Sequence, residues 1–517
     1  MSTAKRRPLL FEYPALPRLE IRFYCLVTAA AVLYAWWCVY NASTKWKFQM
    51  GHLASISNLP IVGQRFKDEI DWEWSRWSPI ARNHILPHLI LNSLVFNFGE
   101  KILPTKLWVL TCILVSMFST AMVYTSRLLF YSIAQGLFIF FCTHYFRSML
   151  VVWISSLPIL YVVMNETKLL SDDPFLVLLF VSYNLLSYIS FNLERVKGTT
   201  RPEDKTTIDL LVRMLFYSFY QPYLISLIVL YTDFERQIKE RGGRKRDWQE
   251  ITFFTLRILF WWLFVEGMLH FFYFGSMLHE VKFAASLPKN EFVTLGMSLC
   301  NFFHLKYVVI FGLPSIFARL DNMQPKEGPM CIARIALISK VWRGFDRGLY
   351  EFFKVYIFVP ICAPTFSLPR KLFGVLVSHT FVLLWHGFMH HNIIWIALNI
   401  VELIIEFGAK SLYSIPGVRK WREANLSDCN FRRILAWLQI VPFAFGLYSN
   451  FYFLGGSEVG YLFVKRIFWE ETVPVRWPFL LLISIGYNYM HVTMEAERWL
   501  GNQERQKLAA KCPAKLK

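Results

Sequence analysis

About a dozen long apolar windows recur along this chain, and they limit its fold more than any other feature. They lie at roughly 21–40, 107–124, 128–143, 148–164, 174–191, 208–231, 251–274, 292–318, 372–389, 392–407, 433–454 and 477–493. A helix needs about 20 apolar residues to cross roughly 30 Å of hydrocarbon, and only helices and closed barrels satisfy their backbone groups there. We therefore predict an all-α, polytopic integral membrane protein with about 10–12 transmembrane or re-entrant helical segments.

The formal net charge of +19 raises the question of nucleic-acid binding. The basic residues lie in short loops between apolar windows and not along one amphipathic face, a pattern typical of positive-inside membrane topology. We predict no nucleic-acid partner, a cytosolic N-terminus with Lys5, Arg6 and Arg7, and cytosolic loops at 233–248 and 410–433. The basic tail is cytosolic as well in this interpretation, so the number of full crossings is even.

The hydrophilic stretches are too short to form a soluble domain. We predict one membrane domain over 21–495, preceded by a cytosolic segment 1–20 and followed by a basic cytosolic tail 496–517. The first window lacks a small-residue cleavage site, so we interpret it as a retained anchor and not as a signal peptide. Nine cysteines show no Cys-x-x-Cys spacing, which predicts neither a disulfide framework nor a structural zinc site.

The stretch "KDEIDWEWSRWSPI" at 67–80 places three tryptophans among charged residues. Such a composition suits an amphipathic segment at the lipid–water boundary, where indole rings anchor. An ordinary loop with tryptophan anchors fits the composition equally well.

Ionisable side chains inside apolar windows are costly, and they mark either structural pairs or functional sites. Glu266 and His270 are four residues apart and share a helical face, so they are able to pair with each other. His304 and Lys306 favour a structural role, because lysine can snorkel to the interface and histidine can bond a neighbouring backbone group.

Asp346 and His386 are the strongest candidates for chemistry. His386 lies between Trp385 and Gly387 in "FVLLWHGFMHHN", and glycine lets backbone or substrate approach the imidazole closely. Asp346 precedes it by forty residues and could orient or charge-stabilise the imidazole. Taken singly, Asp346 is equally typical of a helix cap or of an ion pair with Arg343 or Arg347.

A metal site is the alternative interpretation of these histidines. His386, His390 and His391 form a His-x-x-x-His-His pattern, and His84 with His88 form His-x-x-x-His, as in membrane di-iron enzymes. Such enzymes need about eight histidines in three boxes, whereas the other histidines of this chain are isolated, and Pro87 interrupts the turn between His84 and His88. The di-iron hypothesis is therefore disfavoured.

Several motifs resemble the membrane-bound O-acyltransferase (MBOAT) family and, within it, the hedgehog acyltransferases. They occur in order along some 400 residues: "KDEIDWEWSRW", "LRILFWWLFVEGMLHFFYF", "LKYVVIFGLPSIFARLDNMQP", "WRGFDRGLYEFF", "WHGF", "ALNIVELIIE" and "SNFYFLGGSEVG". Phe-Asp-x-Gly-Leu at 345–349 and Phe-Leu-Gly-Gly-x-Glu-Val-Gly at 453–460 are the most specific of these. The chain is therefore identified as similar to this family over most of its length.

The resemblance implies an enzyme of the endoplasmic reticulum or Golgi membrane that moves a palmitoyl group from palmitoyl-CoA to a secretory protein. The implied acceptor is the N-terminal cysteine amine of a secreted, hedgehog-like signalling protein, and membrane lipids surround the enzyme. His386 and Asp346 match the family's catalytic residues. Trp342 matches a tryptophan that shapes the acyl-CoA pocket, and Asn399, the second expected substrate-binding residue, lies where the family often carries a polar helix residue. Cys331 matches a cysteine that binds haem b through its sulfur.

The chain departs from the family pattern at two places. Leu227 and Ile228 replace a usual Gly-Pro pair, which leaves the donor-pocket lining open, and Met330 replaces a basic residue that could help to hold a haem. Serine O-acylation of a secreted protein and acylation of a lipid remain alternatives within the enzyme class. A non-catalytic membrane scaffold or a transporter remains the alternative outside it.

Overall fold

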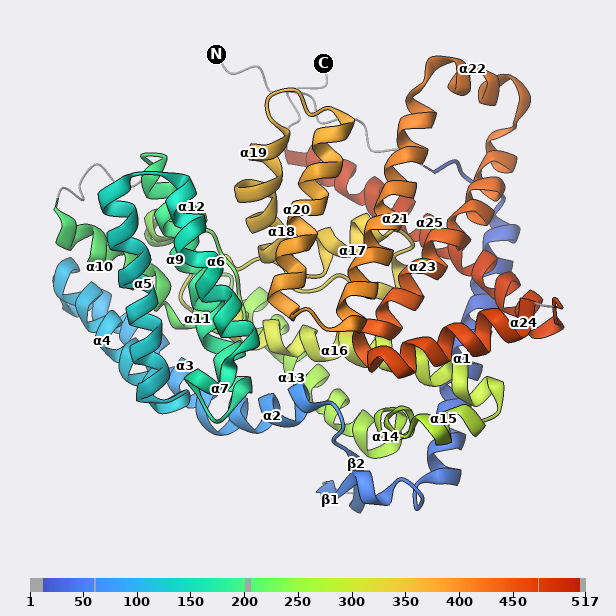
Figure 1. Cartoon of the computed structure of the whole chain (residues 1–517), viewed down its shortest axis with the longest axis horizontal. Helices are drawn as coiled ribbons and strands as arrows, with labels where there is room; N and C mark the ends of the chain where they lie inside the picture. Colours follow the sequence, from blue (N-terminus) through green and yellow to red (C-terminus); the bar gives the residue numbers. More distant parts are fainter. Residues whose placement is uncertain (1–12, 60–61, 200–205, 473, 512–517) are drawn as a thin grey trace.

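The computed structural model describes residues 13–59, 62–199, 206–472 and 474–511. The predicted cytosolic charges at Lys5, Arg6, Arg7, Lys515 and Lys517 lie outside these residues. The described chain is almost entirely helical (Figure 1), and its one sheet has two antiparallel strands, β1 (Ala54–Leu59) and β2 (Gly63–Asp68). The predicted all-α fold class is confirmed.

The helices follow one another with short connections. The first third of the chain forms α1 (Arg18–Trp46), α2 (Trp72–Ile80), α3 (Leu86–Ile102), α4 (Thr105–Val123), α5 (Ser126–Phe146), α6 (Met149–Asn165), α7 (Thr167–Leu170), α8 (Pro174–Leu176) and α9 (Ser182–Val196). The middle third forms α10 (Thr207–Ser218), α11 (Gln221–Leu224), α12 (Tyr231–Glu240), α13 (Trp248–Phe271), α14 (Phe274–His279), α15 (Val281–Ser286), α16 (Lys289–Leu320), α17 (Ile338–Gly344), α18 (Arg347–Phe353) and α19 (Val359–Cys362). The last third forms α20 (Leu368–His386), α21 (His390–Ser414), α22 (Pro416–Asn425), α23 (Asp428–Phe463), α24 (Glu470–Thr472) and α25 (Trp477–Lys511).

Within the described residues, 8 helical stretches are long and apolar enough to cross a membrane, and α6 is a shorter apolar helix. The basic helix α22 and the β1–β2 hairpin lie at opposite ends of the molecule (Figure 1), and α1 connects these two sides. The protein is therefore a multi-pass membrane protein. Under the predicted topology, α22 marks the cytosolic side and the hairpin marks the lumenal side.

The apolar window at 208–231 does not form one spanning helix. It forms α10 and α11, and the chain then runs without helix from Ile225 to Leu230. Pro222 stands in the first turn of α11, where it prevents a continuous helix. Gln221 donates to the Ser116 carbonyl over 3.0 Å, so this break is buried but its polar groups are bonded.

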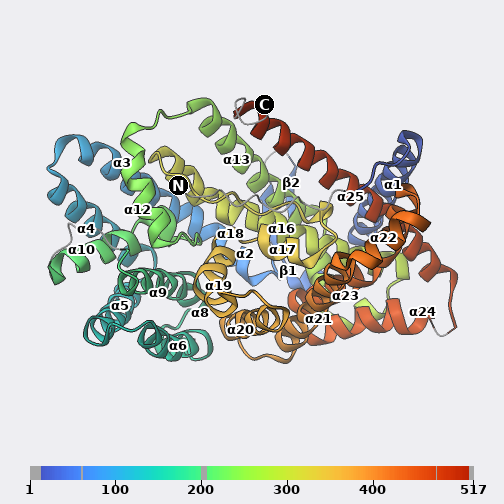
Figure 2. The same ribbon diagram turned by 90° about the horizontal axis from the view of Figure 1, so that it is seen from above.

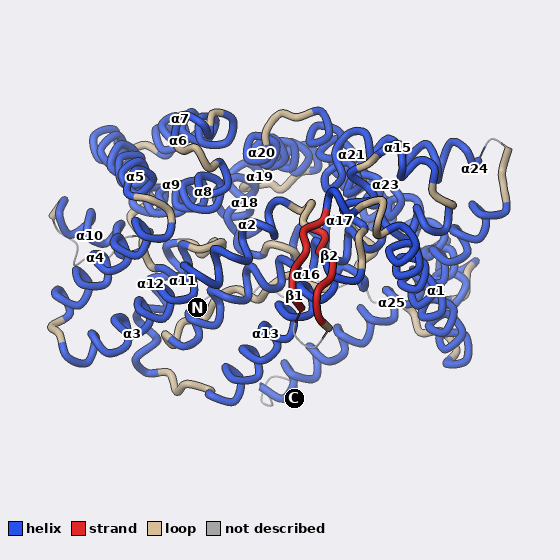
Figure 3. Tube along the Cα trace, turned by 90° about the horizontal axis from the view of Figure 1, so that it is seen from below, coloured by secondary structure: helices blue, strands red, loops and turns tan. Residues whose placement is uncertain are grey.

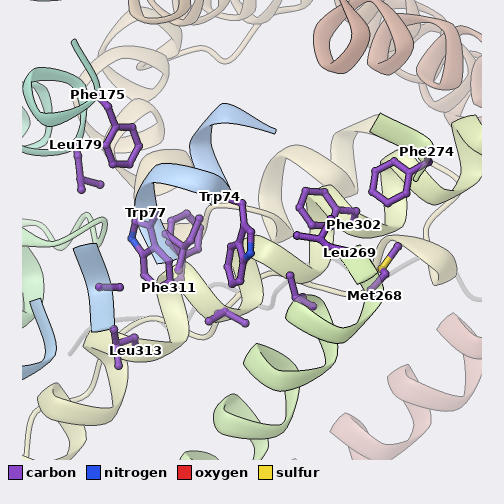
Figure 4. Close-up of a cluster of buried hydrophobic side chains, with 14 of the residues drawn as sticks. Trp74, Trp77, Phe175, Leu179, Met268, Leu269, Phe274, Phe302, Phe311 and Leu313 are labelled. Carbon is purple, nitrogen blue, oxygen red and sulfur yellow. The ribbon is translucent and has the colours of Figure 1, made fainter. Parts of the chain in front are cut away.

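The tryptophan-rich stretch forms α2, and it packs against protein. Asp71 caps the helix by accepting the Trp74 amide over 2.8 Å. The Trp74 and Trp77 rings are fully buried beside Phe302 and Phe311 of α16 (Figure 4). Only Trp72 is exposed, so the anchoring role that we expected for all three rings is wrong for two of them.

The hairpin that precedes α2 lies beside α13 (Figure 3). Ser57 of β1 bonds His270 Nε2 over 2.5 Å, and Lys67 of β2 pairs with Glu266 over 2.8 Å. Asp68 accepts the Gly275 amide over 2.7 Å. The hairpin is thus fastened to the helix core by specific polar contacts.

Both ends of the described chain meet α23. Helix α1 runs beside α25 (Figure 2), and Arg432 of α23 lies buried between the chain ends. Its guanidinium bonds Glu495 of α25 and the Pro14 carbonyl, each over 2.8 Å. Arg433 next to it forms two bonds of 2.9 and 2.7 Å with Glu20 of α1.

Candidate active site

His386 is the last residue of α20, at the tight turn into α21 (Figure 1). Gly387 follows with φ of +85° and ψ of 151°, a conformation that is nearly restricted to glycine. Asn392 of α21 donates to the His386 carbonyl over 2.8 Å and to the Gly387 carbonyl over 3.1 Å. These bonds satisfy the free end of α20 and fix the backbone that carries the imidazole.

Two aromatic rings flank the imidazole of His386. Trp395 of α21 and Phe453 of α23 each meet it edge to face, with ring centroids 5.2 Å away, and they stack on each other at 4.1 Å. His386 is nevertheless exposed, so part of it stays accessible beside these two rings.

Trp342 and Asn399 join this group from α17 and α21. The Trp342 indole N–H donates to Asn399 Oδ1 over 3.0 Å, and its ring stacks on Trp395 at 5.8 Å. Asn399 is 1% exposed and donates to the Trp395 carbonyl and to Ser449 Oγ. Three of the residues singled out in the sequence, His386, Trp342 and Asn399, therefore contact the same tryptophan.

Asp346 caps α18, and its neighbour Phe345 stacks on Phe303. Its Oδ1 accepts the Leu349 amide over 2.8 Å, while Arg347 beside it pairs with Glu327 over 2.7 Å. The Tyr183 hydroxyl is close enough to interact electrostatically with both Asp346 and Glu73. Tyr183 also packs against Trp385 at 5.5 Å, which places it between Asp346 and the end of α20.

Asp346 and His386, both described, share no hydrogen bond or ion pair. They are connected through rings: Phe453 meets Phe303 at 5.8 Å, and Phe303 stacks on Phe345 at 5.1 Å. The hypothesis that Asp346 orients the imidazole by direct contact is therefore wrong for this structure, because the carboxylate is used as a helix cap.

Glu266 and His270 do not pair through their side chains. His270 Nδ1 bonds the Glu266 carbonyl over 2.6 Å, and the Glu266 carboxylate accepts from Ser78 over 2.7 Å and from Trp74 over 3.2 Å. Both residues therefore hold the hairpin and α2 against α13.

Lys306 does not snorkel toward water. It is buried on α16 and pairs with Asp71 at 2.7 Å and Glu73 at 2.8 Å, and Tyr307 donates to Glu73 over 2.8 Å. His304 on the same helix is also buried. Lys306 fastens α2 to α16 beside the aromatic layer that carries Phe303.

The remaining histidines of the metal hypothesis point to separate partners. His390 lies near Ser457 at 3.2 Å, and His88 lies near Ser119 at 3.2 Å. Across the described residues, no three side chains of His, Cys, Asp or Glu are placed together to hold a metal ion.

Cys331 is an exposed free thiol at the start of a short turn that precedes α17. The Met330 amide donates to the Gly344 carbonyl over 2.8 Å, which ties this loop to the end of the helix that carries Trp342. An accessible sulfur suits axial ligation of a haem iron from one side. Cys331 therefore fits the role that the resemblance implies for it.

Sequence reasoning missed three residues that shape this site. Asn392, Trp395 and Phe453 contact His386 or its backbone, and all three lie inside or beside apolar windows. Asn392 carried a usable signal, because a buried polar side chain soon after a glycine turn is typical of a helix-end bond. Nothing in the sequence distinguishes Trp395 from a lipid-facing aromatic, whereas Phe453 begins the Phe-Leu-Gly-Gly motif at 453–460 but carried no assigned role.

Comparison with known proteins assigns this arrangement to a family. Residues 107–449 match the model of the MBOAT, membrane-bound O-acyltransferase family. The matched range includes α4 through most of α23, and it contains His386, Asp346, Trp342, Asn399 and Cys331.

Three curated relatives carry the name of a protein-cysteine N-palmitoyltransferase or of a protein like one. The protein-cysteine N-palmitoyltransferase HHAT of Mus musculus is 26% identical over 92% of this chain and 98% of its own length. The protein-cysteine N-palmitoyltransferase Rasp of Drosophila melanogaster is 30% identical over 55% of this chain and 56% of its own length. The HHAT-like protein of Mus musculus is 25% identical over 63% of both chains.

Proposed function

The chain belongs to the membrane-bound O-acyltransferase family and is a membrane-bound acyltransferase, and on this premise we propose its substrates. It transfers a palmitoyl group from palmitoyl-CoA to the α-amino group of the N-terminal cysteine of a secreted, hedgehog-like signalling protein. The names of the relatives HHAT and Rasp support this proposal, as does the similarity to HHAT over nearly the whole chain. The observation that carries it is the exposed His386 inside an aromatic wall.

The reaction requires little covalent help from the protein, because a thioester is already activated. The amine nitrogen of the acceptor attacks the thioester carbonyl carbon, a C–N bond forms, the C–S bond breaks, and the CoA thiol leaves. The His386 imidazole takes the proton from the attacking amine and passes it to the leaving sulfur. Holding both substrates at one point supplies much of the remaining acceleration.

Asp346 faces the acceptor in this proposal. An α-amino group arrives largely as an ammonium ion, and a carboxylate beside the site attracts that charge. One ammonium proton leaves to bulk water before the attack, and the second proton, lost as the C–N bond forms, is the one that His386 passes to the leaving sulfur. Asp346 is held in place by the Leu349 amide, which donates to its Oδ1. This carboxylate would therefore attract the incoming amine, and His386 would then handle its proton.

Trp342 and Asn399 face the donor. Their hydrogen bond fixes the indole plane against Trp395, so a flat apolar wall lies next to His386. The departure at Leu227 and Ile228 lies nearby, because the Ile228 carbonyl touches Gly348 of α18. Acyl-chain preference is thus a property in which this chain can differ from its relatives.

The donor reaches the site from the cytosol and the acceptor from the lumen of the endoplasmic reticulum or Golgi. The lumenal side is the side of the β1–β2 hairpin under the predicted topology. Haem b, where bound, would be held by Cys331, and it would supply a rigid plate against the loop before α17. Replacement of Cys331 by alanine is expected to abolish a Soret band of the purified protein, and a band that survives would contradict thiolate ligation.

The test of the proposed function uses detergent-purified protein with alkyne-palmitoyl-CoA and three peptides. One begins with a free cysteine, one with acetyl-cysteine, and one carries only an internal serine. We expect labelling of the free-cysteine peptide alone, and loss of labelling in the His386→Ala variant. Labelling of the serine peptide alone would favour O-acylation, and transfer that is unchanged in His386→Ala would remove the catalytic role of His386.

A further inference from the structure

His379 is a second histidine on the face of α20 that carries His386. The two are seven residues apart, which is nearly two full turns and about 10 Å along the helix. The His379 ring meets the Trp342 ring edge to face at 4.9 Å, so it contacts the same tryptophan that borders the His386 group. His379 is 6% exposed and thus fully enclosed by the protein.

The hydrogen bond of His379 fixes its tautomer. Its Nδ1 lies 2.8 Å from the Val375 carbonyl, which is only able to accept, so Nδ1 carries the hydrogen. The neutral ring then presents a bare lone pair on Nε2. This nitrogen is buried and has no hydrogen-bond partner.

The neighbouring indole does not satisfy this lone pair. The Trp342 N–H already donates to Asn399, which in turn donates to the Trp395 carbonyl. A buried acceptor without a donor costs roughly 1–3 kcal/mol, so such atoms in native proteins usually await a ligand or an ordered water. The His379 site is therefore built to accept one N–H or O–H group.

The place of His379 along α20 indicates which substrate supplies that group. Helix α20 begins, and helix α21 ends, on the side of the molecule where α22 lies (Figure 1). The turn after His386 joins the two helices at their other ends. His379 lies two turns nearer to α22 than His386, on the cytosolic side under the predicted topology. A donor whose thioester lies at His386 extends its pantetheine arm past His379 on its way to the cytosol.

We infer that His379 Nε2 accepts a hydrogen bond from an amide N–H of the pantetheine arm of the acyl-CoA donor. This inference rests on the proposed function only in taking the donor to be a long-chain acyl-CoA. The bond fixes the distance between the thioester carbon and His386, and it makes His379 a donor-binding residue distinct from the proton-transferring one.

Three variants and two donors test this inference. His379→Leu removes the acceptor, His379→Gln restores an oxygen near the Nε2 position, and Thr380→Val changes the adjacent exposed residue without touching the cluster. The donors are palmitoyl-CoA and an analogue in which the pantetheine amide N–H farther from the sulfur, which lies about 10 Å from the thioester carbon in an extended arm, is replaced by an ester oxygen. Kinetics with a cysteine peptide give kcat and both KM values.

We expect His379→Leu to raise the KM for palmitoyl-CoA about tenfold, the worth of one good buried hydrogen bond, with the peptide KM unchanged. In His379→Gln the KM for palmitoyl-CoA returns most of the way to the wild-type value, and in Thr380→Val it does not change. The ester analogue binds wild-type protein more weakly, and His379→Leu weakens it no further. The inference would be overturned if wild-type protein had the same KM for both donors. It would also be overturned if His379→Leu raised the KM for both donors by the same factor.

A binding measurement tests the role of His379 independently of whether the proposed acceptor is correct. The unreactive thioether analogue of palmitoyl-CoA is titrated against the same variants without any acceptor. A weaker thioether affinity in His379→Leu supports the inference even if the natural acceptor is not a cysteine amine. An affinity equal to that of wild-type protein overturns it, whatever the acylation assay shows.

Discussion

At the residue scale, Asn392 is the side chain that fixes the position of His386. It donates to two carbonyls at the end of α20 and is buried. We expect Asn392→Ala to lower kcat about tenfold, because a buried hydrogen bond of this kind contributes roughly 1.4 kcal/mol. Acyl-transfer kinetics check this. Asn488→Ala removes a similar buried amide bond on α25, far along the chain from the site, and is expected to retain wild-type kcat.

Gly348 is the second residue on which the site depends. An added Cβ would lie 2.1 Å from the Ile228 carbonyl oxygen, a backbone atom that has little room to move. We expect Gly348→Ala to shift α18 with its cap Asp346, to destabilise the protein by about 3 kcal/mol, and to reduce activity severely. Thermal unfolding in detergent and acylation rates measure both effects. Gly328→Ala, where a Cβ meets nothing within 4 Å, serves as the neutral control.

The sequence predicted the site unevenly at this scale. His386, Trp342 and Asn399 were found because motifs marked them, and the structure brings them together around Trp395. The cap role of Asp346 was one of the alternatives that its local sequence allowed, but its separation from His386 depends on how α18 packs. Trp395 stayed hidden because apolar windows do not show which face of a helix meets protein and which meets lipid.

At the scale of elements, α2 is held to α16 by charge as well as by its tryptophans. Lys306 is buried, whereas its partners Asp71 and Glu73 are 26% and 28% exposed, so water partly compensates the carboxylate charges that remain when Lys306 is removed. We expect Lys306→Met to destabilise the protein by about 2 kcal/mol. Adding Asp71→Asn and Glu73→Gln should restore part of this loss. A thermal midpoint of Lys306→Met equal to that of wild-type protein would contradict the prediction.

Helix existence was predictable from the apolar windows, whereas helix continuity was not. The window at 208–231 is apolar throughout, yet Gln221 and Pro222 break it into α10, α11 and an unwound stretch. The unwound backbone is tolerated because it is buried in protein and bonded, for example by the Tyr217 hydroxyl to the Val229 carbonyl over 2.6 Å. Hydropathy records how apolar a segment is but not whether its backbone finds partners elsewhere.

At the scale of the whole molecule, Arg432 and Arg433 join the two ends of the chain through α23. Arg432 is fully buried, whereas the Arg433 side chain is 38% exposed. We expect Arg432→Ala to cost about 3 kcal/mol, because it leaves the Pro14 and His491 carbonyls without their donor, although Glu495 keeps its pair with Arg498. Arg433→Ala should cost about 1 kcal/mol because solvent screens its pair. Thermal unfolding of the two variants side by side checks the order. Equal losses of stability in the two variants would show that the burial of the arginine does not determine how much its removal costs.

The aromatic wall around His386 also bears on how cleanly the enzyme couples its two substrates. Trp395 and Phe453 cover the imidazole edge to face and leave another side of it exposed. Under the proposed function, donor and acceptor together fill that side and keep water from the thioester, so each CoA released should correspond to one acylated peptide. Phe453→Ala would open a path for water, so we expect futile hydrolysis to rise. The ratio of free CoA to acylated peptide measures this hydrolysis, and we expect it to rise in the Phe453→Ala variant.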